Sequence, residues 1–373
     1  MNADRLRTPS LLLDITRVRR NAARMSEVSH RNNVRLRPHI KTHKCVEVAR
    51  IQTEGHNGAI TVSTLAEARA FAEHGFNDIT YAVPIDEGKF DDAIEILKSG
   101  VKLNLLTDDA ETSKKLDEAS VRAGATFDVF VKIDCGYHRV GVEPHTNQAI
   151  EIPRLLSDVK NLNFAGILTH AGHSYDAHSK DEILEIARIE RDSMVELAER
   201  LRAQSIDVPT VSVGSTPTMS TIDHLDGIDE IRPGNYIFFD AFQAKLGSCN
   251  VDDPALTVLT AVVHKDNSRR KLVVDAGAIA LSKDRGPYEI DADCGYGQVL
   301  DLEGRETGMR VTELSQEHGQ IKAGEGDVFD RLKVGDRLRV LANHSCLTAA
   351  QHSHYHVMEN DEIVDRWEIH RGW

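Results

Sequence analysis

The chain of 373 residues is 40% hydrophobic and 28% charged, and its 45 Lys and Arg against 59 Asp and Glu give a net charge of −14. This length accommodates one large domain and a smaller one, and the negative charge disfavours nucleic acid and anionic membrane surfaces. No apolar run approaches the roughly 20 residues of a membrane-spanning helix, and the start MNADRLRTPS lacks the apolar core of a signal peptide. The five cysteines form no C-x-x-C pair. We therefore expect a cytoplasmic protein with reduced thiols that acts on a small molecule.

From residue 15 to about residue 205, the hydrophobic positions switch repeatedly between a period of two and a period of 3.6, which is typical of alternating strands and helices. Eight segments are predicted as strands: 34–41, 59–64, 78–83, 102–108, 127–134, 162–172, 210–216 and 230–240. Eight strands with crossover segments favour an α/β fold of the (β/α)8 TIM-barrel type. An open doubly wound sheet is the alternative.

After about residue 245 the helical periodicity fades, and β-rich segments such as RKLVVDAG and DRLRVLAN are separated by Gly, Asp and Asn turns. We therefore predict a barrel domain over residues 15–245 and a smaller C-terminal β domain over residues 246–373. The N-terminal segment 1–14, which contains TPSLLLD, is expected to join the β domain, because it has no place in the strand count of the barrel.

The first predicted strand ends in RPHIKTHK, at residues 37–44. Functional residues of a (β/α)8 barrel lie at the C-terminal ends of its strands, and strand alternation would place His39 and Lys41 on one side. A lysine directed into the barrel mouth would be partly desolvated, which lowers its pKa and makes its amine a nucleophile toward a carbonyl. The alternative is a surface lysine in a salt bridge.

Two turns rich in small residues end the seventh and eighth predicted strands, VGSTPT at 213–218 and RPGN at 232–235. Backbone amides and hydroxyls in such turns can surround a phosphate, and phosphate sites after strands seven and eight recur in this barrel. Together with Lys41, these turns indicate pyridoxal phosphate as a cofactor.

The segments TPSLLLD, RPHIKTHK, CGYHRVGV (135–142), THAGHSY (169–175), VGSTPT and EIRPGNY together resemble the alanine-racemase-like, fold type III, pyridoxal-phosphate enzymes. The resemblance is specifically to the D-serine dehydratase and D-threonine aldolase group, and it covers nearly the whole chain. It implies that Lys41 holds the cofactor, that Arg139 faces the site, and that Arg232 or Tyr175 lies against the pyridine nitrogen. A surface salt bridge is the alternative role for Arg232. The residues that the resemblance places around the phosphate are Gly214, Ser215, Thr216, Gly234 and Asn235.

A second motif, NHSC at 343–346, offers an imidazole and a thiol two residues apart. In a strand, His344 and Cys346 would point to one face and could bind a divalent metal together with water or substrate. This pair of ligands favours zinc, with manganese and magnesium as alternatives. A core cysteine beside a hydrogen-bonded histidine is the reading without a metal, but the resemblance implies the metal. The roles of further polar residues nearby stay unassigned: Glu317, His318, His352, His354 and His356.

The resemblance implies a lyase for D-3-hydroxy amino acids, in which Lys41 removes the α-proton and the metal activates the 3-hydroxyl group. Loss of that hydroxyl would convert D-serine into pyruvate and ammonia, and D-threonine could be a further substrate. Cleavage between Cα and Cβ would instead give glycine and an aldehyde, as in D-threonine aldolases. We prefer the D-serine dehydratase, because His-x-Cys, VGSTPT and HAGHSY are closer to that branch.

Two other functions are less compatible with the sequence. An amino-acid racemase would leave the His344 and Cys346 pair unexplained, and a non-catalytic pyridoxal-phosphate-binding protein would leave the β domain unexplained. By analogy with the family, we expect a homodimer.

Overall fold

The computed structural model describes residues 5–324 and 327–373. These residues form two compact units. The barrel unit comprises residues 24–41, 49–234 and 370–373, and the sheet unit comprises residues 5–23, 42–48 and 235–369. The predicted boundary at residue 245 stays a prediction, and residues 1–4 of the N-terminal segment lie outside the described residues.

The barrel unit contains a sheet of eight parallel strands. Its strands, in chain order, are β2 (Arg35–Leu36), β3 (Ile60–Val62), β4 (Asp78–Pro84), β5 (Lys102–Thr107), β6 (Phe127–Lys132), β7 (Leu162–Leu168), β8 (Val211–Val213) and β9 (Glu230–Ile231). Segments such as LNLLT of β5 are almost entirely buried, as expected for parallel strands that are covered on both faces.

The two ends of this sheet meet. Within the order β2-β9-β8-β7-β6-β5-β4-β3, the segment after β2 forms a parallel bridge to β3 between His39 and Thr61. The amide of Thr61 donates to the carbonyl oxygen of Pro38 at 2.9 Å. The prediction of a TIM-type barrel with a C-terminal β domain is therefore confirmed, and the open doubly wound sheet is wrong.

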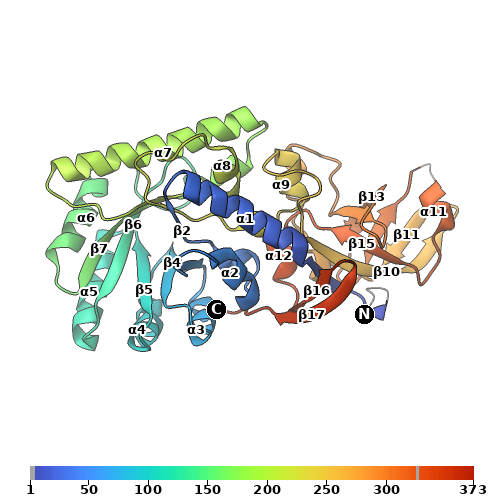
Figure 1. Cartoon of the computed structure of the whole chain (residues 1–373), viewed down its shortest axis with the longest axis horizontal. Coiled ribbons are helices and arrows are strands. Elements are labelled where there is room, and N and C mark those ends of the chain that lie inside the picture. Colours follow the sequence, from blue (N-terminus) through green and yellow to red (C-terminus); the bar gives the residue numbers. More distant parts are fainter. Residues whose placement is uncertain (1–4, 325–326) are drawn as a thin grey trace. The chain divides into compact units, whose positions relative to one another are not determined.

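Helices follow most of the barrel strands, and Figure 1 shows α3, α4 and α5 side by side next to β4 and β5. The helices up to residue 221 are α1 (Ile15–Arg31), α2 (Val46–Thr53), α3 (Leu65–Glu73), α4 (Phe90–Lys98), α5 (Ala110–Ala123), α6 (Gln148–Asp158), α7 (Lys180–Ala203) and α8 (Thr216–Thr221). Side chains cap several N-termini, since Thr64, Asp109 and Ser179 each accept a hydrogen bond from a backbone amide of the first turn.

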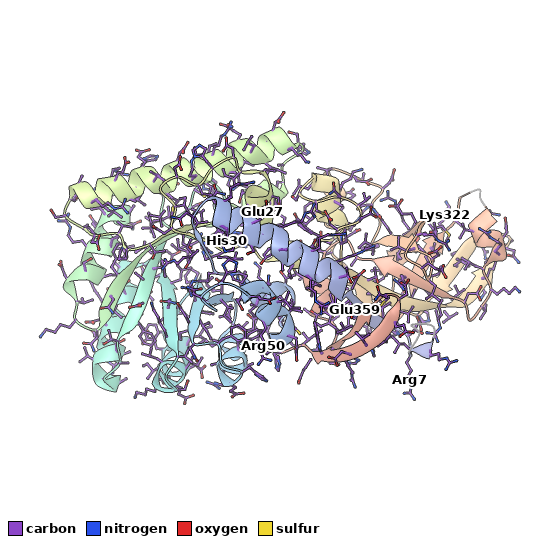
Figure 2. All side chains as sticks on the ribbon, viewed as in Figure 1. Arg7, Glu27, His30, Arg50, Lys322 and Glu359 are labelled. Atoms are coloured by element: carbon purple, nitrogen blue, oxygen red, sulfur yellow. The ribbon has the colours of Figure 1, made fainter. Side chains whose placement is uncertain are left out.

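The first helix shows how the hydrophobic period fixes an element. In α1 the buried residues Val18, Ala22 and Met25 recur at steps of three and four, which places them on one face of the helix. Glu27 and His30 are exposed and project from the same helix in Figure 2. Such a distribution of buried and exposed residues is that of an amphipathic helix.

The sheet unit is built on nine strands in the order β11-β14-β13-β12-β15-β10-β1-β16-β17. The N-terminal strand β1 (Ser10–Asp14) pairs antiparallel with β10 (Leu256–Asp266) and parallel with β16 (His354–Glu359). The other strands are β11 (Lys271–Val274), β12 (Gln298–Leu300), β13 (Glu306–Leu314), β14 (Gly319–Lys322), β15 (Arg337–Leu341) and β17 (Glu362–Glu368). The short helices of this unit are α9 (Ala241–Leu246), α10 (Ala278–Leu281), α11 (Asp327–Arg331) and α12 (Ser345–Ala349).

Two predicted strands are much shorter than expected. The strand predicted at 34–41 ends at Leu36, and the chain turns into a 3-10 helix, η2 (Ile40–Thr42). The strand predicted at 230–240 ends at Ile231, before a second 3-10 helix, η5 (Asn235–Ile237). Pro38 and Pro233 follow these strands, and proline cannot donate a ladder hydrogen bond. The strand alternation that was expected to align His39 with Lys41 is therefore wrong.

Among the described residues, no helix has both the length and the apolar character that crossing a bilayer requires.

A substitution of Gly166 in β7 tests how closely the barrel strands pack. A Cβ at this residue would lie 1.9 Å from the carbonyl oxygen of Thr210, and its φ of +134° is unfavourable for other residues. We expect Gly166→Ala to lower the free energy of unfolding by more than about 2 kcal/mol. The control is Gly124→Ala at the C-terminus of α5, where φ is +60° but no atom lies within 4 Å, and where the cost should be about 1 kcal/mol. Equal losses in chemical denaturation would contradict this account of β7.

Candidate active site

Lys41 lies in the turn that follows the first barrel strand. The backbone amide of His39 donates to the carbonyl oxygen of Pro233 at 3.0 Å, which ties this turn to the segment after β9. The Lys41 amide lies 3.4 Å from Nδ1 of His39. Lys41 is half-buried, whereas Ile40 beside it is fully buried. The turn thus places Lys41 at the C-terminal side of the strands, although by a 3-10 helix rather than by strand alternation.

Positive charges from four segments surround His170, which follows β7. Burial holds the pKa of His170 well below its usual range, and the charges of Lys41, Lys132, Arg232 and Arg139 lower it further. Lys41, Arg232 and Arg139 were predicted as site residues, and the charge of each lowers the pKa of this one imidazole. An electropositive region at this end of the barrel suits an anionic group such as a phosphate.

Lys132, the last residue of β6, is a further cation of this region. It is 5% exposed, and its Nζ donates to the carbonyl oxygen of Ile133 at 3.2 Å. Burial and the neighbouring Arg232 lower the pKa of Lys132 to about 8, although Cys135 and Glu190 act in the opposite direction. Burial raises the pKa of the nearby Cys135 thiol to about 12, which makes that thiol unreactive.

Arg232 is held by a buried hydrogen-bond chain. Its Nε donates to Oγ of Ser212 at 2.8 Å, and its Nη2 donates to the carbonyl oxygen of Thr169. Ser212 donates in turn to Glu230 at 2.8 Å, and Glu230 pairs with Nε of Arg37 at 2.8 Å. Burial lowers the pKa of Arg232 to about 10, despite Glu230 and Glu190. Arg232 is 4% exposed, so the alternative of a surface salt bridge is wrong.

The turn after β8 is closely packed. Gly214 has a φ of +112°, and a Cβ there would approach Cγ of Met219 at 3.0 Å and the amide nitrogen of Arg232 at 3.3 Å. Ser215 caps α8, because its Oγ accepts from the Thr218 amide at 3.2 Å while its own amide donates to Oγ1 of Thr218 at 2.9 Å. The Ser215 hydroxyl also lies 2.9 Å from the Ser174 hydroxyl.

The other predicted cofactor residues of the barrel unit have different settings. Arg139 is exposed, and its guanidinium carbon lies 4.7 Å from the ring centroid of Tyr137. Tyr175 is half-buried at the end of the 3-10 helix η4 (Gly172–Tyr175), while Thr216 and Gly234 are buried. Their contacts with a cofactor stay predictions.

The sheet unit carries the predicted metal ligands. Sγ of Cys346 lies 3.3 Å from the hydroxyl oxygen of Thr42 and 3.4 Å from Nδ2 of Asn235. Asn235, predicted at the phosphate, therefore contacts the thiol in this structure, and its role at the phosphate stays a prediction. Nδ1 of His344 lies 2.6 Å from a carboxylate oxygen of Asp284, which leaves Nε2 of the imidazole for another partner.

His344 and Cys346 influence each other's protonation. Burial would raise the pKa of the Cys346 thiol, but the His344 charge and hydrogen bonds from His344, Thr42 and Asn235 lower it to about 7. Burial alone would lower the pKa of His344, but Cys346 and Asp284 raise it well above its usual value. Both shifts favour the charged forms of the two groups, and a divalent cation can replace the proton that they share.

The expected strand geometry of NHSC is wrong. His344 is the N-cap of α12, and Cys346 lies in the first turn of this helix. The side chains meet because the chain turns at Ser345, and not because strand residues two apart share a face.

The residues whose roles were left unassigned all belong to the sheet unit. Glu317 and His318 occupy the exposed turn between β13 and β14. Nε2 of His354 lies 3.2 Å from Nε2 of His356, and Nε2 of His352 lies 3.0 Å from the carbonyl oxygen of Ala280. Across the described ranges, no set of three or more His, Cys, Asp or Glu side chains is arranged to hold a metal ion.

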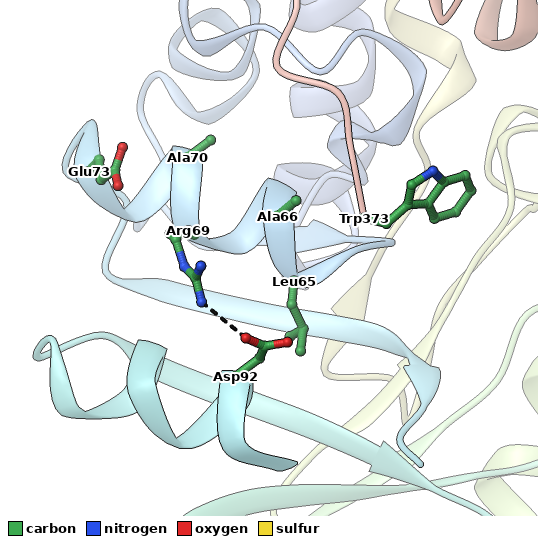
Figure 3. Close-up of a pocket in the computed structure, with 7 residues that line it drawn as sticks. All are labelled: Leu65, Ala66, Arg69, Ala70, Glu73, Asp92 and Trp373. Atoms are coloured by element: carbon green, nitrogen blue, oxygen red, sulfur yellow. Dashed lines mark hydrogen bonds and ion pairs between the residues drawn. The ribbon is translucent and has the colours of Figure 1, made fainter. Parts of the chain in front are cut away.

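A pocket on the barrel unit lies on its helical exterior. It is lined by residues of α3, Asp92 of α4 and Trp373, and Arg69 pairs with Asp92 at 3.3 Å (Figure 3). None of the candidate site residues lines it, so we do not assign the reaction to this pocket.

Comparison with known proteins agrees with the geometry. Residues 13–241 match the family described as "Alanine racemase, N-terminal domain", and residues 255–358 match the "Putative serine dehydratase domain". The D-threo-3-hydroxyaspartate dehydratase of Delftia sp. (strain HT23) is 40% identical, over 99% of this chain and 98% of that enzyme. The chain belongs to the D-serine dehydratase and D-threonine aldolase group of alanine-racemase-like pyridoxal-phosphate enzymes.

Other members of the group extend this relationship. The D-serine dehydratase of Dictyostelium discoideum is 35% identical, over 99% of this chain and 98% of that enzyme. A cysteine-to-alanine mutant of D-threo-3-hydroxyaspartate dehydratase, solved in a metal-free form, superposes with a TM-score of 0.96 at 39% identity, over 100% of both chains. The D-threonine aldolase of Arthrobacter sp is 28% identical, over 98% of this chain and 92% of that enzyme. The chain is accordingly a pyridoxal-phosphate-dependent lyase that acts on D-hydroxy amino acids.

Both predicted groups fit the residues present. The electropositive region around His170 and the close-packed Gly214 turn suit a phosphorylated cofactor, and Lys41 supplies the amine that can hold its aldehyde. The thiol of Cys346, whose pKa is lowered to about 7, and the imidazole of His344, whose Nδ1 is held by Asp284, suit a divalent metal.

Sequence reasoning missed several of these residues. Lys132 had a signal, because a lysine inside the apolar run FDVFVKID is unusual. Glu190 accepts from the amides of Ala171 and Gly214 at 2.9 and 3.2 Å, but in the sequence it is one of many acidic residues of a long helix. Asp284 is 60 positions from His344, and nothing in the sequence linked the two.

The buried charge of Lys132 should make the cofactor-free fold less stable. Because its folded pKa of about 8 lies below the ordinary value of 10.5, the unfolded chain binds more protons between these pH values, and stability rises with pH across that window. Below about pH 8 both states are protonated and the full cost is present. We expect Lys132→Met to raise the unfolding free energy at pH 7 by about 2 kcal/mol and to flatten the pH dependence.

The matched control for this prediction is Lys102→Met. Lys102 is exposed at the start of β5, with Nζ 3.2 Å from a carboxylate oxygen of Asp128, so its loss should change little. Urea denaturation of the cofactor-free proteins from pH 7 to 10.5 measures both variants. A destabilised Lys132→Met protein with an unchanged pH profile would contradict the role given to the buried ammonium.

Proposed function

We propose that this enzyme is a D-3-hydroxy-amino-acid dehydratase that converts D-serine into pyruvate and ammonia, with a divalent metal, preferably zinc, held by His344 and Cys346. The observation that carries the proposal is the geometry of one turn, which holds the Cys346 thiol two residues from an imidazole that Asp284 orients. Such a pair suits zinc, and a metal with open coordination positions can bind a substrate hydroxyl.

The properties of the relatives support the metal. One solved structure of D-threo-3-hydroxyaspartate dehydratase is a cysteine-to-alanine mutant in a metal-free form, and another is a histidine-to-alanine mutant. The motif His-x-Cys of this chain offers the same two types of side chain.

Chain connectivity links the two groups of residues. Lys41 is followed directly by Thr42, and consecutive Cα atoms are about 3.8 Å apart. The Thr42 hydroxyl lies 3.3 Å from Sγ of Cys346, so the residue next to the proposed cofactor lysine contacts a proposed metal ligand. The proposed cofactor lysine is therefore one residue along the chain from a residue that contacts Cys346.

Lys41 would hold the aldehyde of the cofactor and, once released by the substrate, its amine would accept the α-proton. Bound pyridoxal phosphate supplies an electron sink for the charge that develops at Cα. Arg232, a cation at neutral pH that is fixed by Ser212 and Thr169, would lie against the pyridine nitrogen and donate to it. Lys132 and the turn at Gly214 would attract and enclose the phosphate.

At the other end of the substrate, His344 and Cys346 would hold the metal, whose Lewis acidity makes the 3-hydroxyl a better leaving group. Asp284 keeps Nε2 of His344 directed outward by its bond to Nδ1. In the net reaction D-serine gives pyruvate and ammonia, because the water lost from Cβ is recovered when the nitrogen is released.

A second substrate is favoured by one observation. The relative at 40% identity acts on D-threo-3-hydroxyaspartate, which differs from D-serine by a carboxylate on Cβ. The chemistry of dehydration is the same for both, and only the pocket around the Cβ substituent distinguishes them.

A product assay tests the proposal. We expect D-serine and D-threo-3-hydroxyaspartate to yield a 2-oxo acid with an equal amount of ammonia, and D-threonine to yield 2-oxobutyrate at a lower rate. The ratio of kcat/KM for the first two substrates identifies the preferred one. Glycine with an aldehyde as the main product would make the enzyme an aldolase and would refute the proposal. Lys41→Ala should abolish turnover of every substrate, because it removes both the cofactor attachment and the base.

A further inference from the structure

Asp240, in the sheet unit, lies beneath the turn that carries the two proposed metal ligands. It is 1% exposed and is the N-cap of α9, where Oδ1 accepts from the Gln243 amide at 2.9 Å. Its other oxygen, Oδ2, accepts from the amide of Ser345 at 3.0 Å and from the Ser345 hydroxyl at 3.2 Å. One carboxylate thus fixes both the start of α9 and the residue between His344 and Cys346.

The bonds to Ser345 restrict the ligand pair. Ser345 joins His344 to Cys346, so the orientation of its peptide decides the directions in which both side chains leave the backbone. An amide and a hydroxyl that share one buried acceptor leave this turn little freedom. A metal site needs such restriction, because its ligands must keep their distances within a few tenths of an ångström.

Asp240 also acts on the thiol through a second residue. Nδ2 of Asn235 donates to Oδ2 of Asp240 at 2.9 Å and lies 3.4 Å from Sγ of Cys346. The carboxylate therefore orients the amide group that contacts the sulfur. Asn235 is 5% exposed, so water does not compete effectively for these bonds.

The charge of Asp240 has no cationic partner among these contacts, since its donors are Gln243, Ser345 and Asn235. A buried carboxylate with only neutral donors is costly unless a cation lies nearby. A divalent ion bound by one thiolate and one neutral imidazole carries a net positive charge, which Asp240 and Asp284 would offset. In this structure the positive charge near Asp240 is that of the His344 imidazole, and a bound metal would take its place.

We propose that Asp240 is a positioning residue for the divalent metal site, which fixes the His344–Ser345–Cys346 turn and supplies negative charge that raises the affinity for the metal. The inference rests on the proposed function, since it assumes a metal at His344 and Cys346. The inference goes beyond the proposed function because it gives a role to Asp240, which would touch neither the metal nor the substrate.

The experiment uses Co²⁺ as the probe, added to the holoenzyme after chelation of its native metal. Cobalt bound by a thiolate gives a charge-transfer absorption in the near ultraviolet, which reports both binding and the geometry of Cys346. We expect Asp240→Asn and Asp240→Ser to weaken Co²⁺ binding about 10- to 100-fold and to shift this absorption. Asn and Ser both serve as N-caps, so α9 keeps its capping group in either variant.

Two further proteins make the outcomes distinct. Cys346→Ser should abolish the charge-transfer absorption. The proposed metal site itself would be refuted if the wild-type protein lacked this absorption, or if the Cys346→Ser variant kept it. Asp253→Asn is the matched control, because Asp253 is 3% exposed in the same unit and accepts from the Asn250 amide at 2.8 Å. Its Co²⁺ affinity should equal that of the wild type.

Asp240 variants that bind Co²⁺ with wild-type affinity and spectrum would overturn the inference while leaving the metal site intact. Variants that weaken Co²⁺ binding with an unchanged thermal unfolding temperature would support it. If both variants fail to fold, Asp240 is required for the fold, and the specific assignment to the metal site is overturned.

Discussion

The barrel unit depends on how carboxylates and hydroxyl groups hold its buried positive charges. Arg37 lies between Glu230 and Asp78, and burial would lower its pKa if these two carboxylates did not raise it. Glu230 connects through Ser212 to Arg232, so one carboxylate serves two guanidinium groups on neighbouring strands. Breaking such a buried network leaves a charge uncompensated, which costs about 3–5 kcal/mol. The network keeps Arg232 rigid and leaves the adjoining Lys132 and Lys41 with an excess of positive charge.

That excess is a functional feature rather than a stabilising one. The lowered pKa values of His170, Lys132 and Arg232 all reflect burial together with like charges. An anionic cofactor would relieve this repulsion, because it brings negative charge to a region in which positive side chains are in excess. In the sheet unit the situation is reversed, since Asp240, Asp284 and the Cys346 thiol gather negative charge. The barrel unit therefore has an excess of positive charge, which the anionic cofactor that we assign to it would balance. The sheet unit gathers negative charge, which the divalent cation that we assign to it would balance.

Much of this could be predicted from the sequence, because the strong signals are local. Each of the eight segments predicted as strands overlaps a barrel strand, and the motifs that carry Lys41, Arg232 and the Gly214 turn lie at the ends of those strands. The errors arose where a single residue overrides a pattern. Pro38 and Pro233 end their strands early, and the turn at His344 replaces an expected strand, because Asp240 supplies an acceptor for the Ser345 amide. Glu190 and Asp284 were missed since their partners are distant in the sequence, and no period of hydrophobic residues reports such contacts.

We propose that Lys41, and no other lysine of the chain, holds the cofactor. Lys132 is the relevant competitor, because burial lowers its pKa from the ordinary value to about 8, although its side chain is only 5% exposed. Borohydride reduction of the holoenzyme makes the bond between the cofactor and its lysine irreversible. Proteolysis and mass spectrometry then identify the lysine that carries the pyridoxyl group. The account predicts the modification on the peptide that contains Lys41 and an unmodified Lys132. A pyridoxyl group on Lys132, or on any lysine other than Lys41, would contradict it.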